Sequence, residues 1–139
     1  EFDYYCNAWP GSYMVGYGST VLTRGVGMMR WFGFEHVQLF GADHAVDNDI
    51  AHANGETIQE AYGNPILVHG EIAGKRWVTR PDMLMAAVHL AKLIKAEPDY
   101  FTLHGDTLPG ALLTMTDDEL DAVCSQQMPG DDLPDFSED

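Results

Sequence analysis

The sequence has little cysteine and no long apolar run, and both absences narrow the class of protein. Its two cysteines, Cys6 and Cys124, lie far apart in the chain, so a dense disulfide framework is excluded and a cytoplasmic location is expected. No segment approaches the roughly 18 consecutive apolar residues that a transmembrane helix needs. The first residues also lack the basic and apolar regions of a secretory signal. We therefore expect a globular protein without a membrane partner.

Positive charge is also scarce. The 139 residues include 22 Asp and Glu but only 7 Lys and Arg, which gives a formal net charge of −15. A chain of this charge repels the phosphate backbone of DNA or RNA, so nucleic acid is excluded as the main partner. Nine of the acids and none of the bases fall within residues 117–139. We predict a single α/β domain over residues 1–116, followed by an acidic C-terminal helix and partly disordered tail over residues 117–139.

Segments with helical periodicity alternate with short apolar segments typical of buried strands, which favours an α/β fold over an all-α or all-β one. One helix is expected to be capped by Ser19 or Thr20 and to end at Gly33, and another to open with a capping-box pattern at residues 79–82 and to end before Pro98. The remaining expected elements are strands at residues 36–41 and 100–103, a hairpin over residues 66–78 around Gly70 and Gly74, and a helix over residues 116–127 that starts at a Thr116–Glu119 capping box.

Two glycines, Gly25 and Gly27, fall inside the first expected helix. A glycine in a helix interior costs about 1 kcal/mol relative to alanine. We therefore expect another backbone to approach closely at these positions.

A glycine-rich segment runs directly into the same helix. In Gly16-x-Gly18-Ser19-Thr20, exposed backbone N–H groups, hydroxyl donors and the positive end of the helix dipole could hold a phosphate or carboxylate. The spacing matches neither a P-loop nor a dinucleotide-binding fingerprint, so a plain turn with a Ser or Thr cap is the alternative. The anion-binding prediction rests on Gly18, Ser19 and Thr20.

A second candidate site follows the strand expected at residues 36–41. Asp43 leaves the carboxyl end of that strand, where open α/β sheets bind their ligands. Carboxylate oxygens suit Mg²⁺ or Mn²⁺ with a bridging nucleotide phosphate, whereas histidines would also accept Zn²⁺ or Fe²⁺. We expect Asp43 to bind metal and His52 to be catalytic, and the alternative is a solvated polar loop. The potential ligands in this loop are Asp43, His44, Asp47, Asp49, His52 and Glu56.

The segment His104-Gly105-Asp106 follows the second expected strand in the same way. Because the carboxyl ends of neighbouring parallel strands meet at one edge of a sheet, this loop and the Asp43 loop are expected to converge on one crevice. His104 would then be a catalytic base and Asp106 a ligand contact. A purely structural role for His104 is the alternative.

Several segments of the chain resemble one protein family. In that family a Gly-Ser/Thr segment starts a helix, the helix ends in a Gly-Phe pair, and a strand ends in Gly-x-Asp before a loop that contains histidine. The resemblance is to the 6-hydroxymethylpterin pyrophosphokinase MptE-like family, and it covers roughly residues 14–113. The matching segments are Gly18-Ser19-Thr20-Val21, Trp31-Phe32-Gly33-Phe34, Val37-Gln38-Leu39-Phe40-Gly41-Ala42-Asp43, His52-Ala53, Val78-Thr79-Arg80-Pro81-Asp82 and Leu103-His104-Gly105-Asp106.

The resemblance implies a Rossmann-like α/β fold, with a mostly parallel sheet and flanking helices, related to sialyltransferase-like enzymes. Members of the family transfer pyrophosphate from ATP to a pterin with Mg²⁺, and others are motility accessory factors associated with CMP-sugar transfer. By this likeness Asp43 and His52 would line the nucleotide or acceptor crevice, and Ser19 and Thr20 would face phosphate. The family usually begins with a strand and a Gly-Pro-Ser-Leu loop, and residues 1–15 contain neither. We expect the chain to hold only the C-terminal part of the family domain, or to represent a branch without that loop.

Three functions are carried forward. The leading hypothesis is a nucleotide-dependent transferase that uses Mg²⁺, a donor such as ATP or a CMP-sugar, and a small-molecule acceptor. The second is a non-catalytic ligand-binding or assembly module, which pairs with another copy of itself or with a missing N-terminal half. The third is a metal-dependent hydrolase that uses the same Asp and His loops.

Overall fold

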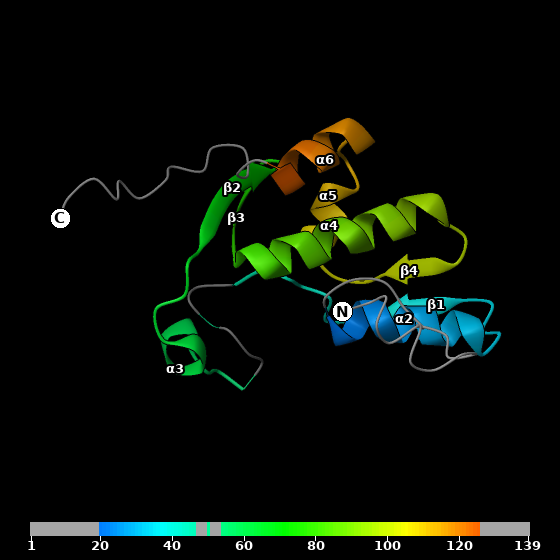
Figure 1. Cartoon of the computed structure of the whole chain (residues 1–139), viewed down its shortest axis with the longest axis horizontal. Coiled ribbons are helices and arrows are strands. Elements are labelled where there is room, and N and C mark those ends of the chain that lie inside the picture. Colours follow the sequence, from blue (N-terminus) through cyan, green and yellow to red (C-terminus); the bar gives the residue numbers. More distant parts are fainter. Residues whose placement is uncertain (1–19, 47–49, 51–53, 126–139) are drawn as a thin grey trace, which may run out of the picture.

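The structure is a computed structural model that describes residues 20–46, 50 and 54–125 of the chain. Helices and short strands alternate, and they include one parallel strand pair, which agrees with the predicted α/β class (Figure 1). The elements, in chain order, are α2 (Val21–Trp31), β1 (Val37–Leu39), α3 (Ile58–Tyr62), β2 (Val68–Ile72), β3 (Lys75–Thr79), α4 (Pro81–Ala96), β4 (Phe101–Leu103), α5 (Leu108–Leu112) and α6 (Asp117–Ser125).

The parallel pair is formed by β1 and β4, whose registers place Val37 beside Phe101 and Leu39 beside Leu103. Side chains of a strand alternate between its two faces, so these four apolar residues share one face. That face packs on α2 and α4 in a core cluster. The buried members of this cluster are Val26, Leu39, Ala42, Leu90, Ile94 and Phe101.

Helix α2 begins and ends where the sequence predicted. The Thr20 hydroxyl accepts a hydrogen bond from the Thr23 amide as N-cap, and Gly33 follows the helix with φ 84°. Among the described residues, a Cβ added at Gly25 would meet nothing within 4 Å, so the close backbone approach expected there is not found. At the other end of α2, Arg30 forms an ion pair with Glu97, just before β4. The N-terminus of α2 therefore lies toward the carboxyl ends of the strands (Figure 1).

The antiparallel hairpin of β2 and β3 is confirmed with shifted boundaries. Its turn is Ala73-Gly74, with φ values of 54° and 74°, which glycine adopts readily and alanine does not. Gly70 belongs to the strand and pairs with Trp77, so it takes no part in the turn. The buried Trp77 indole donates to the carbonyl of Ile72 at 3.2 Å, which holds the hairpin closed.

Helix α4 is the central helix of the fold. Leu90 and Ile94 pack into the sheet cluster, whereas Ala87 and Val88 pack into a second cluster with the hairpin and the C-terminal helices. The helix is preceded by Arg80 as N-cap and has Pro81 in its first turn. Arg80 makes no side-chain cap, so the capping-box pattern predicted at residues 79–82 does not form.

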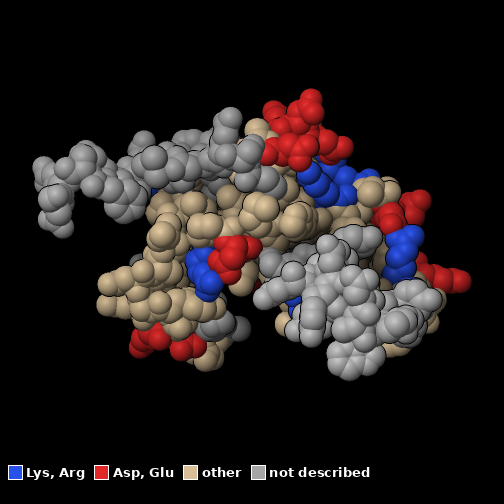
Figure 2. Space-filling view, viewed as in Figure 1, with Lys and Arg blue, Asp and Glu red and all other residues tan. Residues whose placement is uncertain are grey.

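Two short helices complete the second cluster. Thr107 caps α5, a helix that the sequence reading missed, by accepting a hydrogen bond from the Gly110 amide. The predicted Thr116–Glu119 capping box is confirmed at the start of α6. Lysines of α4 then pair with aspartates of α6, as the charged layer in Figure 2 shows; the pairs are Lys92–Asp121 and Lys95–Asp117. Among the described residues, no helix is both long and apolar enough to cross a membrane.

Candidate functional site

The two strand-end loops lie side by side, as the sequence predicted. The His104 amide donates to the carbonyl of Leu39 at 2.9 Å, and the Leu108 amide donates to the carbonyl of Asp43 at 3.1 Å. These bonds extend the contact between β1 and β4 beyond the ends of both strands. The backbone segments that carry Asp43 and Asp106 are thus fixed relative to one another.

Among the described residues, the side chains of His104 and Asp106 nevertheless contact other partners than Asp43. The His104 ring stacks on Phe40 with centroids 4.1 Å apart, and its Nε2 lies 3.2 Å from Oε1 of Gln38. Asp106 pairs with Lys75 at 2.6 Å and lines a separate hollow. The pocket that the described residues form around Asp43 therefore has neither His104 nor Asp106 in its lining, which differs from the single crevice expected.

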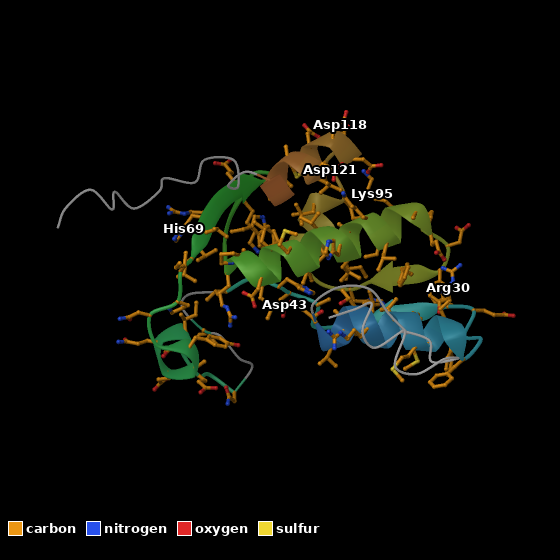
Figure 3. All side chains as sticks on the ribbon, viewed as in Figure 1. Arg30, Asp43, His69, Lys95, Asp118 and Asp121 are labelled. Carbon is orange, nitrogen blue, oxygen red and sulfur yellow. The ribbon has the colours of Figure 1, made fainter. Side chains whose placement is uncertain are left out.

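The Asp43 pocket has a volume of about 370 Å³ and lies between the end of β1, helix α3 and the start of α4. Figure 3 places Asp43 beside the first half of α4, at the opposite end of the sheet layer from Arg30. Gly41, with φ 64°, makes the bend that carries the chain from β1 into this pocket. The lining residues are Gly41, Asp43, His44, Ala45, Val46, Ile58, Tyr62, Thr79, Arg80 and Met83.

The loop after β1 is tied to the hairpin at two points. The buried Thr79 hydroxyl donates to the carbonyl of His44 at 2.5 Å, and the Val46 amide donates to the carbonyl of Val78 at 2.8 Å. Between these ties His44 has a positive φ of 53°, a conformation that histidine adopts only rarely. The position of His44 is therefore set by contacts from β3 rather than by the preference of its own backbone.

His44 carries a defined tautomer. Its Nδ1 lies 3.0 Å from the carbonyl of Ala42, and a carbonyl oxygen can only accept a hydrogen bond. Nδ1 must therefore carry the hydrogen, which leaves Nε2 of the neutral ring as a proton acceptor. The imidazole is half-buried in the pocket wall and can act there as a base.

Arg80 is the cation of the pocket. Its Nε and Nη2 donate to the two carboxylate oxygens of Asp82 at 3.0 and 2.8 Å, and its guanidinium carbon lies 4.2 Å from the centroid of the Tyr62 ring. The side chain is 26% exposed. Arg80 also precedes a 16-residue helix. Pro81 has no N–H, and the amides of Asp82 and Met83 have no acceptor within the helix. Positive charge and hydrogen-bond donors therefore meet at this side of the pocket.

The other predicted residues have different positions. Thr20 uses its hydroxyl as the cap of α2. Gly18, Ser19 and His52 lie outside the described residues. Asp43 is exposed, and the described residues contain no group of three His, Cys, Asp or Glu side chains that could hold a metal ion. A cation at Asp43 would thus need most of its ligands from water or from a bound phosphate.

The sequence analysis does not predict the pocket residues Ile58 and Tyr62, because it interprets residues 43–56 as a loop and places no element between that loop and the hairpin expected over residues 66–78. Thr57 and Glu60 form a complete capping box, with each side chain bonded to the backbone of the other residue. The Thr-x-x-Glu spacing is the signal that would have predicted α3 and hence Tyr62.

A second hollow, of about 330 Å³, lies between the hairpin turn and α5. Lys75 spans it, with its ammonium 4.2 Å from the Trp77 ring centroid and paired with Asp106. Among its described lining residues Lys75 is the single cation, and it is already paired with Asp106. The helix beside this hollow, α5, has only five residues.

In comparisons with known proteins, no family model, no curated protein and no solved structure matches the chain.

Proposed function

We propose that the Asp43 pocket binds the phosphate of a nucleotide and that the chain is a Rossmann-like, nucleotide-dependent transferase domain. The observation that carries the proposal is Arg80 at the start of α4, which is held against the Tyr62 ring and lines the same pocket as His44 and Asp43. Arginine suits phosphate because its planar N–H donors match the spacing of the phosphate oxygens. The N-terminus of α4 adds backbone N–H donors and the positive end of the helix dipole.

Asp43 is the proposed partner of Mg²⁺. Its carboxylate is exposed at the pocket and, among the described residues, makes no hydrogen bond or ion pair. Mg²⁺ in nucleotide sites is commonly held by one or two carboxylates together with substrate phosphates and water, so a single Asp fits this role. A bound cation would also offset the repulsion between a polyphosphate and a chain of net charge −15.

His44 is the proposed base of the transfer. Its Nε2 is the free acceptor of the ring because Nδ1 is held by the Ala42 carbonyl. In a transferase this nitrogen would take the proton of an acceptor hydroxyl as that oxygen attacks the donor. The bond between the transferred group and the nucleoside monophosphate would break in the same step, and the monophosphate would leave with the bonding electrons. This assigns to His44 the role that the sequence assigned to His52 and His104.

Isothermal titration with ATP and with CTP, each with and without Mg²⁺, tests the proposal. We expect Mg²⁺-dependent binding to the wild type, a loss of at least about tenfold in Arg80→Gln, and a loss of the Mg²⁺ effect in Asp43→Asn. Arg76→Gln, on the exposed side of β3, removes the same charge and should bind like the wild type.

Two outcomes would count against this function. No binding of either nucleotide, or equal losses in Arg80→Gln and Arg76→Gln, would exclude the Asp43 pocket as a phosphate site. Nucleotide binding without transfer to any acceptor would favour the ligand-binding module over the transferase.

A further inference from the structure

We infer that Asp82 is an internal competitor for the anion site, so that it lowers the affinity of the Asp43 pocket for phosphate until a ligand displaces it. The inference rests on the proposed function, because it concerns the regulation of the same pocket. It is carried by the bidentate contact between Arg80 and Asp82 and by the position of Arg80 in the pocket wall.

The geometry of the pair is that of a bound anionic ligand. Both carboxylate oxygens of Asp82 accept hydrogen bonds, one from Nε and one from Nη2, which is the fork arrangement that arginine also makes with phosphate. Asp82 therefore occupies the N–H donors of Arg80 in the same way as a phosphate ligand would. It comes from the first turn of α4, only two residues from Arg80, so its local concentration is high.

Displacement of Asp82 does not require Arg80 to move. The Tyr62 ring packs on the guanidinium face, with 4.2 Å between the ring centroid and the guanidinium carbon. This contact uses the face of the group and leaves its edge, where the N–H donors lie, to exchange one anion for another. The Nη1 donors are not used by Asp82, so a phosphate can approach before the carboxylate leaves.

The carboxylate itself can leave at low cost. The Asp82 side chain is 50% exposed, so it can turn into water without burying a charge. Ligand binding would thus exchange an intramolecular anion for an external one while Arg80 stays paired throughout. Because a ligand must displace Asp82, it needs further contacts in the pocket in order to bind. This requirement favours a nucleotide, which makes such contacts, over free inorganic anions.

NMR titration of the full chain with inorganic pyrophosphate tests the inference at constant ionic strength. Asp82→Asn keeps the shape of the side chain and removes its charge, and we expect it to bind pyrophosphate about tenfold more tightly than the wild type. Asp99→Asn removes a charge from an exposed residue in the turn before β4, and should bind like the wild type. Amide spectra of each variant show that the fold is kept.

The possible outcomes distinguish a failure of this inference from a failure of the proposed function. If neither the wild type nor Asp82→Asn binds pyrophosphate or nucleotide, the phosphate site itself is refuted. If the wild type binds and Asp82→Asn binds equally well or more weakly, Asp82 is not a competitor, and the proposed function stands without it. An equal gain in pyrophosphate affinity in Asp99→Asn would mean that the effect comes from the overall charge, and it would also overturn the inference.

Discussion

Thr79 donates its hydroxyl hydrogen to the carbonyl of His44, across 35 positions of sequence, and so ties the end of β3 to the loop after β1. Thr79 is 1% exposed, so the bond is sheltered from water. The bond thus joins His44, the proposed base, to the residue that precedes Arg80, the proposed phosphate ligand. One hydrogen bond therefore helps to hold in place both residues to which we assign a chemical role in the pocket.

Replacement of Thr79 should show how much its hydrogen bond to the His44 carbonyl contributes to the stability of the protein. Thr79→Val keeps the shape of the side chain but leaves the His44 carbonyl without its donor, and we expect a loss of about 1–3 kcal/mol in the free energy of unfolding. Thr79→Ser keeps the hydroxyl and loses a methyl group, at about 0.8 kcal/mol. Urea denaturation of the two variants measures the difference. A Val variant as stable as the wild type would show that the bond contributes nothing.

Gly25 offers a stabilising substitution within α2. Because a Cβ there would meet nothing within 4 Å, Gly25→Ala should raise the stability by about 0.5–1 kcal/mol through helix propensity alone. At Gly110 in α5, the added Cβ would lie 3.1 Å from Oγ1 of Thr107, the atom that caps the helix. Gly110→Ala should therefore give no gain. Thermal denaturation compares them, and a lower midpoint for Gly25→Ala would restore the expectation of a close backbone neighbour.

The capping carboxylates should make stability depend on pH in the acid range. Hydrogen bonds from the backbone and hydroxyl of Thr116 lower the pKa of Glu119 in the folded state, and those from Thr57 lower the pKa of Glu60. The hydrogen bond from Lys95 lowers the pKa of Asp117. The unfolded state therefore binds protons first, so the stabilisation is complete above the unfolded-state pKa of about 4.3 for Glu and is lost as the pH falls through the lower folded-state values.

The measurement is the urea midpoint of unfolding between about pH 3 and about pH 6. Glu119→Gln should flatten the dependence on pH, since the amide cannot titrate. Glu71→Gln, on the exposed side of β2, provides the matched control and should keep the wild-type slope. A Glu119→Gln slope identical to that of the wild type would contradict the role of this cap.

The elements with strong periodicity could be predicted from the sequence. Helix α4 combines an apolar face with Pro81 at its start, and β1 and β4 each have apolar residues on either side of one polar residue, so each signal is local in the sequence. The capping box expected at Thr79 does not form, because the contact that decides its side chain is distant in the sequence. Its hydroxyl found a partner at His44, and no local pattern encodes that tertiary contact.

The direction of His104 could have been predicted but was not. Side chains alternate along a strand, so a residue directly after Leu103 points away from the face that Leu103 shares with the core. His104 accordingly joins Gln38 and Phe40 on the other face of the sheet. Asp43 lies beyond the glycine bend at Gly41, which breaks this alternation and sends its side chain to a different pocket.

The location of the phosphate site is the central claim, and an amide NMR titration with pyrophosphate tests it most directly. We expect the largest shifts on the amides of residues 42–46, 80, 82 and 83, and we expect Arg80→Gln to remove these shifts. Shifts concentrated on residues 73–75 and 105–107, around the Lys75 hollow, would contradict it, as would shifts in the wild type that persist unchanged in Arg80→Gln.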